Sequence, residues 1–127
     1  MAIKFFKVKE LDRNLKATVH QSGKMGFTIE ASNKMELTVD KSVSIGMDED
    51  NAEDTNLYVV VNELKEEDSF AVLKAGDYYY INTKPLFSTL KIDYKKNSIS
   101  YEIRKDEKDG MELFVFELKQ KEFPFKY

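Results

Sequence analysis

Two stretches of this sequence share a pattern: ATVHQSGKMGFTIEASNKMELTVD (residues 17–40) and FAVLKAGDYYYINTKPLFSTLKID (residues 70–93). Aligned without a gap, they pair similar residues in the same order: Val19 with Val72, Gly23 with Gly76, Phe27 with Tyr80, Leu37 with Leu90, Val39 with Ile92, and Asp40 with Asp93. After an insertion at residues 94–96, SVSI (42–45) matches SISY (98–101) and LYVVV (57–61) matches LFVFE (113–117). Chance similarity of two β-rich segments is the alternative, but the constant order favours a duplicated unit.

Each copy predicts the order strand, turn, strand, short helix, strand, loop, strand. In the first copy, strands at 18–21 and 25–29 flank Gly23, a residue type that tolerates the positive φ of a chain reversal. Helices are expected at 30–37, where Ala31 and Met35 share one face, and at 84–90, where Pro85 follows a possible cap at Thr83. The closing strands alternate with period two, and the sequence Asp109-Gly110 predicts a hairpin turn between the last two.

The first copy resembles the AbrB-type swapped-hairpin family of small transcription regulators and antitoxins. The residues that fit the family pattern, in order, are Gly23, Lys24, Met25, Phe27, Glu30, Ala31, Met35, Leu37, Val43 and Ile45. Thr28, Ser32, and Val39 with Asp40 replace the family's usual proline, arginine and Gly-Asp turn. The second copy matches chiefly at Gly76, Tyr80, Leu90, Ile99 and Tyr101. The resemblance implies two interleaved hairpin units in one barrel, here supplied by a single chain.

The expected fold is therefore mostly β with two short α-helices, built from tandem ββαββ repeats that form a pseudo-two-fold, swapped-hairpin-like barrel. The expected organisation is a basic N-terminal arm (1–16), repeat 1 (17–62), an acidic linker (63–69), repeat 2 (70–118) and an aromatic, basic C-terminal tail (119–127). A unit of this size buries too little apolar surface alone, so pairing with its copy supplies the missing core. Leu37 and Leu90 are expected to lie in that core.

The composition of the chain excludes several kinds of site and indicates a cellular location. The 127 residues contain 20 Lys and Arg against 23 Asp and Glu, a formal net charge of −3, and no cysteine. The absence of cysteine removes disulfides, thiol catalysis and thiolate metal sites, and it fits a reducing compartment. No apolar run reaches the length of a signal peptide core or a membrane span, so we expect a cytoplasmic protein without a membrane partner.

No catalytic, metal or cofactor site is expected. His20 is the only histidine and has no nucleophile partner in the sequence, so a surface or hydrogen-bonded strand histidine is favoured over a general base. The acidic runs at 48–54 and 105–110 lie in predicted loops and are interpreted as solvated charge. A calcium loop starting at Asp48 is rejected, because Ala52 and Val59 occupy positions that require oxygen ligands.

Two function classes remain. The first is a non-enzymatic, AbrB-like DNA-binding regulator that holds the phosphate backbone through its basic N-terminal end, with these candidate residues: Lys4, Lys7, Lys9, Arg13, Lys16 and Lys24. Tyr78, Tyr79 and Tyr80 are candidates for stacking on bases, with core packing as the competing explanation. The second class is a protein-interaction or assembly component, of a phage or mobile element for example, that docks through residues 1–10 and 119–127. The sequence leaves the oligomeric state open.

Overall fold

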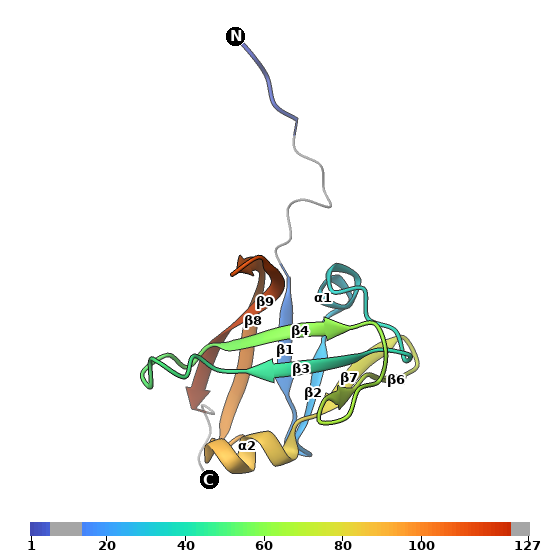
Figure 1. Cartoon of the computed structure of the whole chain (residues 1–127). Coiled ribbons are helices and arrows are strands. Elements are labelled where there is room, and N and C mark those ends of the chain that lie inside the picture. Colours follow the sequence, from blue (N-terminus) through green and yellow to red (C-terminus); the bar gives the residue numbers. More distant parts are fainter. Residues whose placement is uncertain (6–13, 123–127) are drawn as a thin grey trace.

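The computed structural model of this chain describes residues 1–5 and 14–122, in which strands predominate and two short helices occur (Figure 1). The first half contains β1 (Lys16–Val19), β2 (Lys24–Phe27), α1 (Ile29–Lys34), β3 (Ser42–Gly46) and β4 (Leu57–Asn62). The second half contains β5 (Phe70–Ala71), β6 (Leu73–Ala75), β7 (Tyr78–Asn82), α2 (Lys84–Leu90), β8 (Asn97–Lys108) and β9 (Met111–Glu122).

The strands form one antiparallel sheet that is nearly closed into a barrel. Their order across the sheet is β5-β3-β4-β9-β8-β1-β2-β7-β6. The two outermost strands, β5 and β6, are separated in sequence only by Val72, whose N–H donates to the Lys41 carbonyl at 3.1 Å. Because one short stretch of chain supplies both ends of the sheet, the sheet must curl back on itself, and closure of this kind hides most strand edges.

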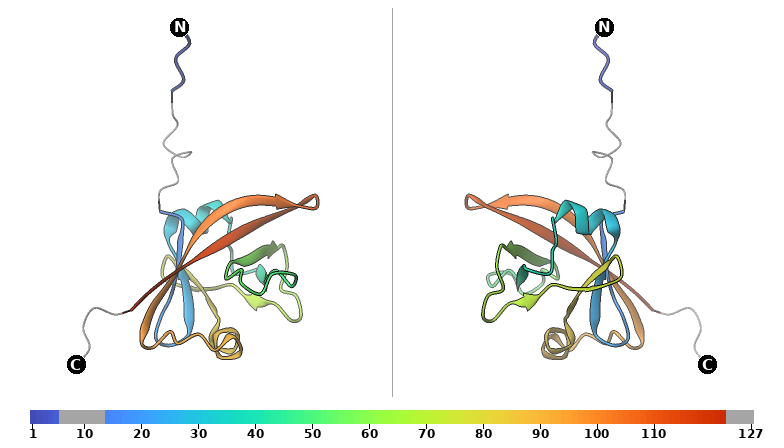
Figure 2. Two further views of the ribbon diagram at one scale, coloured as in Figure 1. Left: turned by 90° about the vertical axis from the view of Figure 1, so that its left-hand side faces the viewer. Right: turned by 90° about the vertical axis from the view of Figure 1, so that its right-hand side faces the viewer.

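The barrel interior is filled by the inward-facing residues of almost every strand. Met25, Ile81, Val43, Leu57 and Phe116 are all fully buried, and they come from five different strands. The two helices lie at opposite ends of the barrel (Figures 1 and 2). At the α1 end, Ala31 and Met35 are buried, and at the α2 end the ring of Phe87 is fully buried.

The two helices begin differently. The Thr28 side chain caps α1 by accepting a hydrogen bond from the Ala31 N–H at 3.2 Å, as expected of a threonine at this position. Thr83 occupies the N-cap position of α2, as predicted, but its side chain makes no capping hydrogen bond. Its hydroxyl instead donates to the Gly23 carbonyl at 2.7 Å, and this buried contact ties α2 to the β1–β2 turn.

The mostly β fold with two short helices is confirmed, and the Asp109-Gly110 turn falls between β8 and β9 as predicted. The predicted helix at 84–90 coincides with α2, whereas α1 is shorter than predicted and ends at Lys34. Leu37 is buried as expected, but Leu90 is only partly buried. The β8–β9 hairpin is longer than predicted, and its tip extends beyond the rest of the barrel (Figure 2).

Candidate nucleic-acid interface

One end of the barrel is assembled from three segments that contact one another, and we call it the α2 end: residues 20–24, 84–90 and 91–97. Gly23 adopts φ +91°, and a Cβ at this position would lie 2.6 Å from the Lys84 Cβ. Only glycine therefore fits between the β1–β2 turn and the first turn of α2. The Gln21 side chain donates to the Lys95 carbonyl at 3.3 Å, which joins the third segment to the same turn.

The α2 end is strongly basic. Its exposed lysines are Lys24, Lys84, Lys91, Lys95 and Lys96, and its only acidic residue is Asp93. The Asp93 carboxylate accepts hydrogen bonds from the backbone N–H groups of Lys95 and Lys96, both at 3.0 Å. Within the described residues, none of these five lysines forms an ion pair. The end therefore carries excess positive charge that no ion pair within the described side chains neutralises.

Two tyrosines lie next to the α2 end on the outer face of the barrel. Tyr78 and Tyr80 alternate with the inward-facing residues of β7, and their ring centroids are 6.4 Å apart with 21° between the planes. Lys24 belongs to both regions, because its Nζ lies 4.9 Å from the centroid of the Tyr80 ring. Tyr79 lies on the other side of the strand, where it packs partly against the core.

The structure separates the basic residues that the sequence grouped together. Lys16 lies beside α1, since its carbonyl accepts from the N–H of the α1 cap Thr28 at 3.0 Å, whereas Lys24 lies at the α2 end. Lys4 is exposed, and Lys7, Lys9 and Arg13 lie outside the described residues. Among the members of the predicted set that the structure describes, Lys24 is the one brought together with Tyr78 and Tyr80.

The sequence reasoning missed four of the five lysines at the α2 end. Lys84, Lys91, Lys95 and Lys96 lie in or directly after α2, and the run KIDYKK (91–96) was the local signal for three of them. The insertion at 94–96 was identified only as a gap between repeats. Its juxtaposition with Lys24 depends on the packing of α2 against the β1–β2 turn, which the sequence does not specify.

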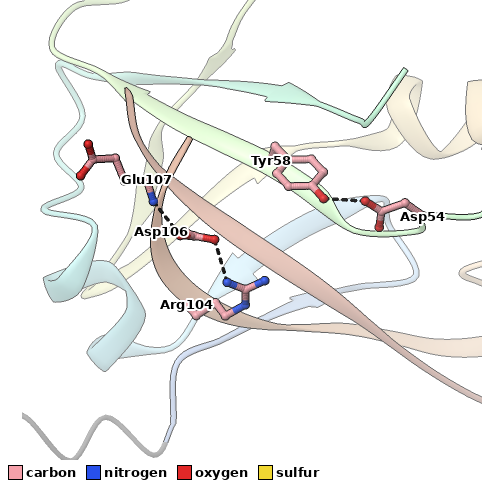
Figure 3. Close-up of polar contacts among 5 residues, drawn as sticks. All are labelled: Asp54, Tyr58, Arg104, Asp106 and Glu107. Carbon is pink, nitrogen blue, oxygen red and sulfur yellow. Dashed lines mark hydrogen bonds and ion pairs between the residues drawn. The ribbon is translucent and has the colours of Figure 1, made fainter. Parts of the chain in front are cut away.

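A second charged region lies where the β3–β4 loop meets the tip of the β8–β9 hairpin, and we call it the hairpin-tip region: residues 48–58 and 104–112. Here each of the three basic side chains has a partner, and Figure 3 shows one of these contacts, between Arg104 and Asp106. Arg104 pairs with Asp106 at 2.9 Å, Lys105 with Glu112 at 3.8 Å, and the Lys108 Nζ lies 5.8 Å from the Tyr58 ring centroid.

Two carboxylates of the hairpin-tip region have lowered pKa values. A hydrogen bond from the Tyr58 hydroxyl, 2.5 Å long, is the main reason that the pKa of Asp54 is lowered, and the same bond raises the pKa of Tyr58. The pKa of Asp106 is lowered first by the Glu107 N–H and then by Arg104 (Figure 3). Burial does not cause either shift; hydrogen bonds and nearby cations stabilise the ionised form of both carboxylates.

His20 is exposed, and its Nε2 lies 2.6 Å from the Tyr78 hydroxyl. It therefore has a hydrogen-bond partner, as the sequence reading favoured. Among the described residues, no group of three or more His, Cys, Asp and Glu side chains is arranged to hold a metal ion. In residues 1–5 and 14–122 no helix has the length and apolar character needed to cross a membrane.

No family model, curated protein or solved structure matches this chain. Function therefore has to be inferred from the chain's own residues.

Proposed function

We propose that this protein binds nucleic acid through its α2 end. The observation that carries this proposal is the group of five exposed lysines that form no ion pair within the described residues, gathered from the start of β2, α2 and the loop after it. Ammonium groups held close together repel one another, so a polyanion that contacts several of them at once relieves this repulsion and releases its own counterions.

The residue types favour contact with the sugar-phosphate backbone. Lysine presents a compact charge on a flexible stem, whereas sequence reading in the DNA major groove relies largely on the bidentate geometry of arginine, asparagine or glutamine. The α2 end contains no arginine. We therefore expect weak dependence on base sequence and strong dependence on salt concentration.

The specific form of this proposal is an AbrB-like DNA-binding regulator, in which one chain replaces the usual pair of swapped-hairpin units. The pattern of strand pairing supports a tandem ββαββ architecture. In this architecture β1 corresponds to β5–β6, β2 to β7, β3 to β8, and β4 to β9. Replacing each strand by its counterpart turns the β1–β8 pairing into the β5–β3 pairing. It likewise turns the β1–β2 pairing into the β6–β7 pairing. The β2–β7 and β4–β9 pairings convert into themselves. A pseudo-two-fold axis through these two central pairs would relate the repeats.

The test is fluorescence anisotropy of labelled random duplex and single-stranded oligonucleotides, titrated with the full chain at about 50 and 200 mM salt. We expect binding that weakens steeply with salt. Lys84→Gln, Lys95→Gln and Lys96→Gln combined should lower the magnitude of the log–log salt slope by about 2 to 3, because each lysine neutralises up to one phosphate.

The matched control removes the same positive charge from the hairpin-tip region: Arg104→Gln, Lys105→Gln and Lys108→Gln. The salt slope of this control variant should be nearly the same as that of the unaltered chain. If the magnitude of the salt slope falls equally in the two triple variants, only net charge matters and the α2 end is not the binding site. If the full chain binds neither oligonucleotide at low salt and high micromolar protein, the proposed function is contradicted.

A protein-interaction role is the second candidate, and the exposed apolar residues near the N-terminus favour it. Ile3 and Phe5 expose 66% and 83% of their surface. Such side chains are expected to dock on a partner protein, together with the rest of residues 1–10 and the tail at 119–127. A photo-crosslinking residue at position 5 tests this role: a defined adduct that is lost with Ile3→Ser would support it, and absence of any adduct would contradict it.

A further inference from the structure

The outer face of β2 and β7 carries an aromatic surface made of the Tyr78 and Tyr80 rings. The rings are nearly parallel, with 21° between their planes, and Tyr78 exposes 38% of its surface. A tyrosine on a strand usually pairs with the side chains directly opposite it on the neighbouring strands. Here the residue opposite Tyr80 in the β2–β7 register is Gly26, which has no side chain.

Gly26 lets the Tyr78 ring lie directly over the strand. A Cβ at position 26 would be 1.2 Å from the Tyr78 hydroxyl oxygen and 2.0 Å from the adjacent ring carbon. Any other residue at this position would therefore displace the phenol. The ring covers Gly26, which is buried although it lies on the outer side of the sheet.

Two neighbours, one in the β1–β2 turn and one at the start of β2, hold these rings in place. The His20 Nε2 lies 2.6 Å from the Tyr78 hydroxyl, and the Lys24 ammonium lies over the Tyr80 ring at 4.9 Å from its centroid. These contacts reduce the conformational entropy that the rings would lose on binding a ligand. They also make the aromatic surface continuous with the lysines of the α2 end.

We propose that Tyr78 and Tyr80 form a stacking surface for the unpaired bases of a single-stranded nucleic acid whose phosphates bind the lysines of the α2 end. The inference rests on the proposed function and specifies its ligand. In a duplex the base faces are covered by neighbouring bases, so a tyrosine ring cannot stack on them, whereas every base of a single strand offers a free face. The lysines alone would bind both ligands, and the tyrosines select the single strand.

The test compares a labelled 12-nucleotide oligo-dT with a 12-base-pair duplex at about 50 mM salt, by anisotropy with the full chain. Tyr78→Leu combined with Tyr80→Leu should weaken single-strand binding by about 5- to 150-fold, which corresponds to the loss of one stacked base, and should leave duplex binding within about twofold. Tyr58→Leu, at the hairpin-tip region, is the matched control and should leave both affinities unchanged.

Gly26→Ala provides a second variant that removes no aromatic ring. It should weaken single-strand binding selectively, because the added methyl group displaces Tyr78. Thermal melts identify variants that fail to fold; if the double tyrosine variant fails, Tyr78→Leu alone replaces it. Salt-dependent binding that is equal for both oligonucleotides and insensitive to Tyr78, Tyr80 and Gly26 would overturn this inference while leaving the proposed function intact. No binding of either oligonucleotide would overturn both.

Discussion

The α2 end and the hairpin-tip region are both rich in charge, but they differ in how that charge is compensated. In the hairpin-tip region, Arg104 and Lys105 form ion pairs, and Lys108 lies over the Tyr58 ring as Lys24 lies over the Tyr80 ring. At the α2 end, five exposed lysines face a single aspartate, which is itself engaged by backbone N–H groups. Charges paired within the chain offset one another, whereas like charges that are left together repel one another and slightly destabilise the fold. This difference is the reason for proposing the α2 end as the region that binds an external anion.

The largest expected effect comes from removing the aromatic side chain that anchors the α2 end. Phe87 is fully buried and packs on Tyr94 and Tyr101, with centroid distances of 6.2 and 6.3 Å. Phe87→Ala should lower the free energy of unfolding by about 3 to 5 kcal/mol in denaturant melts, through lost burial and a cavity. Met111→Ala, at the half-exposed tip of the β8–β9 hairpin, should cost under about 0.5 kcal/mol. Similar losses in the two variants would mean that the α2 end is not part of the core.

The next effect distinguishes two tyrosines whose pKa values are raised for different reasons. Burial raises the pKa of Tyr101 to about 12, whereas the hydrogen bond to Asp54 raises that of Tyr58. Because the folded-state pKa of Tyr101 exceeds its unfolded value of 10.0, its contribution to stability is present below pH 10.0 and is lost as the pH rises toward 12. Tyr101→Phe should reduce this alkaline loss, as measured by urea melts at neutral and alkaline pH.

Tyr101→Phe should also be tolerated at neutral pH. Within the described residues, the buried Tyr101 hydroxyl has no hydrogen-bond partner. Removing it should therefore increase the free energy of unfolding, by at most about 1 kcal/mol. A loss well above about 1 kcal/mol would show that the hydroxyl is hydrogen-bonded in solution. Tyr58→Phe is the control, and it should leave the alkaline loss assigned to Tyr101 in place.

Only part of this fold could be predicted from the sequence. Strand periodicity, the Asp109-Gly110 turn and the α2 segment were readable because each depends on neighbouring residues in the chain. The path of residues 70–75, which pairs with β3 before Val72 and with β7 after it, was not readable, because it depends on the curvature of the whole sheet. The same limit explains why Lys16 and Lys24, close in sequence, were grouped although they lie at opposite ends of the β1–β2 hairpin.

A smaller effect compares the two triple charge variants in stability rather than binding. Lys84→Gln, Lys95→Gln and Lys96→Gln combined should raise the free energy of unfolding by a few tenths of a kcal/mol at low salt, because like-charge repulsion is relieved. Arg104→Gln, Lys105→Gln and Lys108→Gln combined should lower it, because three partnered cations are lost. Urea melts at low and high salt measure both changes. If the free energy of unfolding changed in the same direction in both triple variants, the two regions would not differ in how their charges affect stability.

The smallest effect concerns Asp54 in the hairpin-tip region. Its lowered pKa means that its stabilising contribution is present above the unfolded pKa and is lost as the pH falls through the lower folded value. Tyr58→Phe removes the principal hydrogen bond, so the Asp54 pKa should rise toward its ordinary value of 3.8 in a carboxyl NMR titration. Asp106, which is stabilised by Glu107 and Arg104, is an internal control whose pKa should not move.

The most direct test of the central claim is NMR mapping of a single-stranded oligonucleotide onto the full chain at about 50 mM salt. If the α2 end is the binding region, chemical-shift changes will concentrate at residues 20–26, 78–84 and 91–97 and disappear as salt is raised. Changes confined to residues 1–16 or to the hairpin-tip region, or no changes at all, would contradict the assignment of nucleic-acid binding to the α2 end.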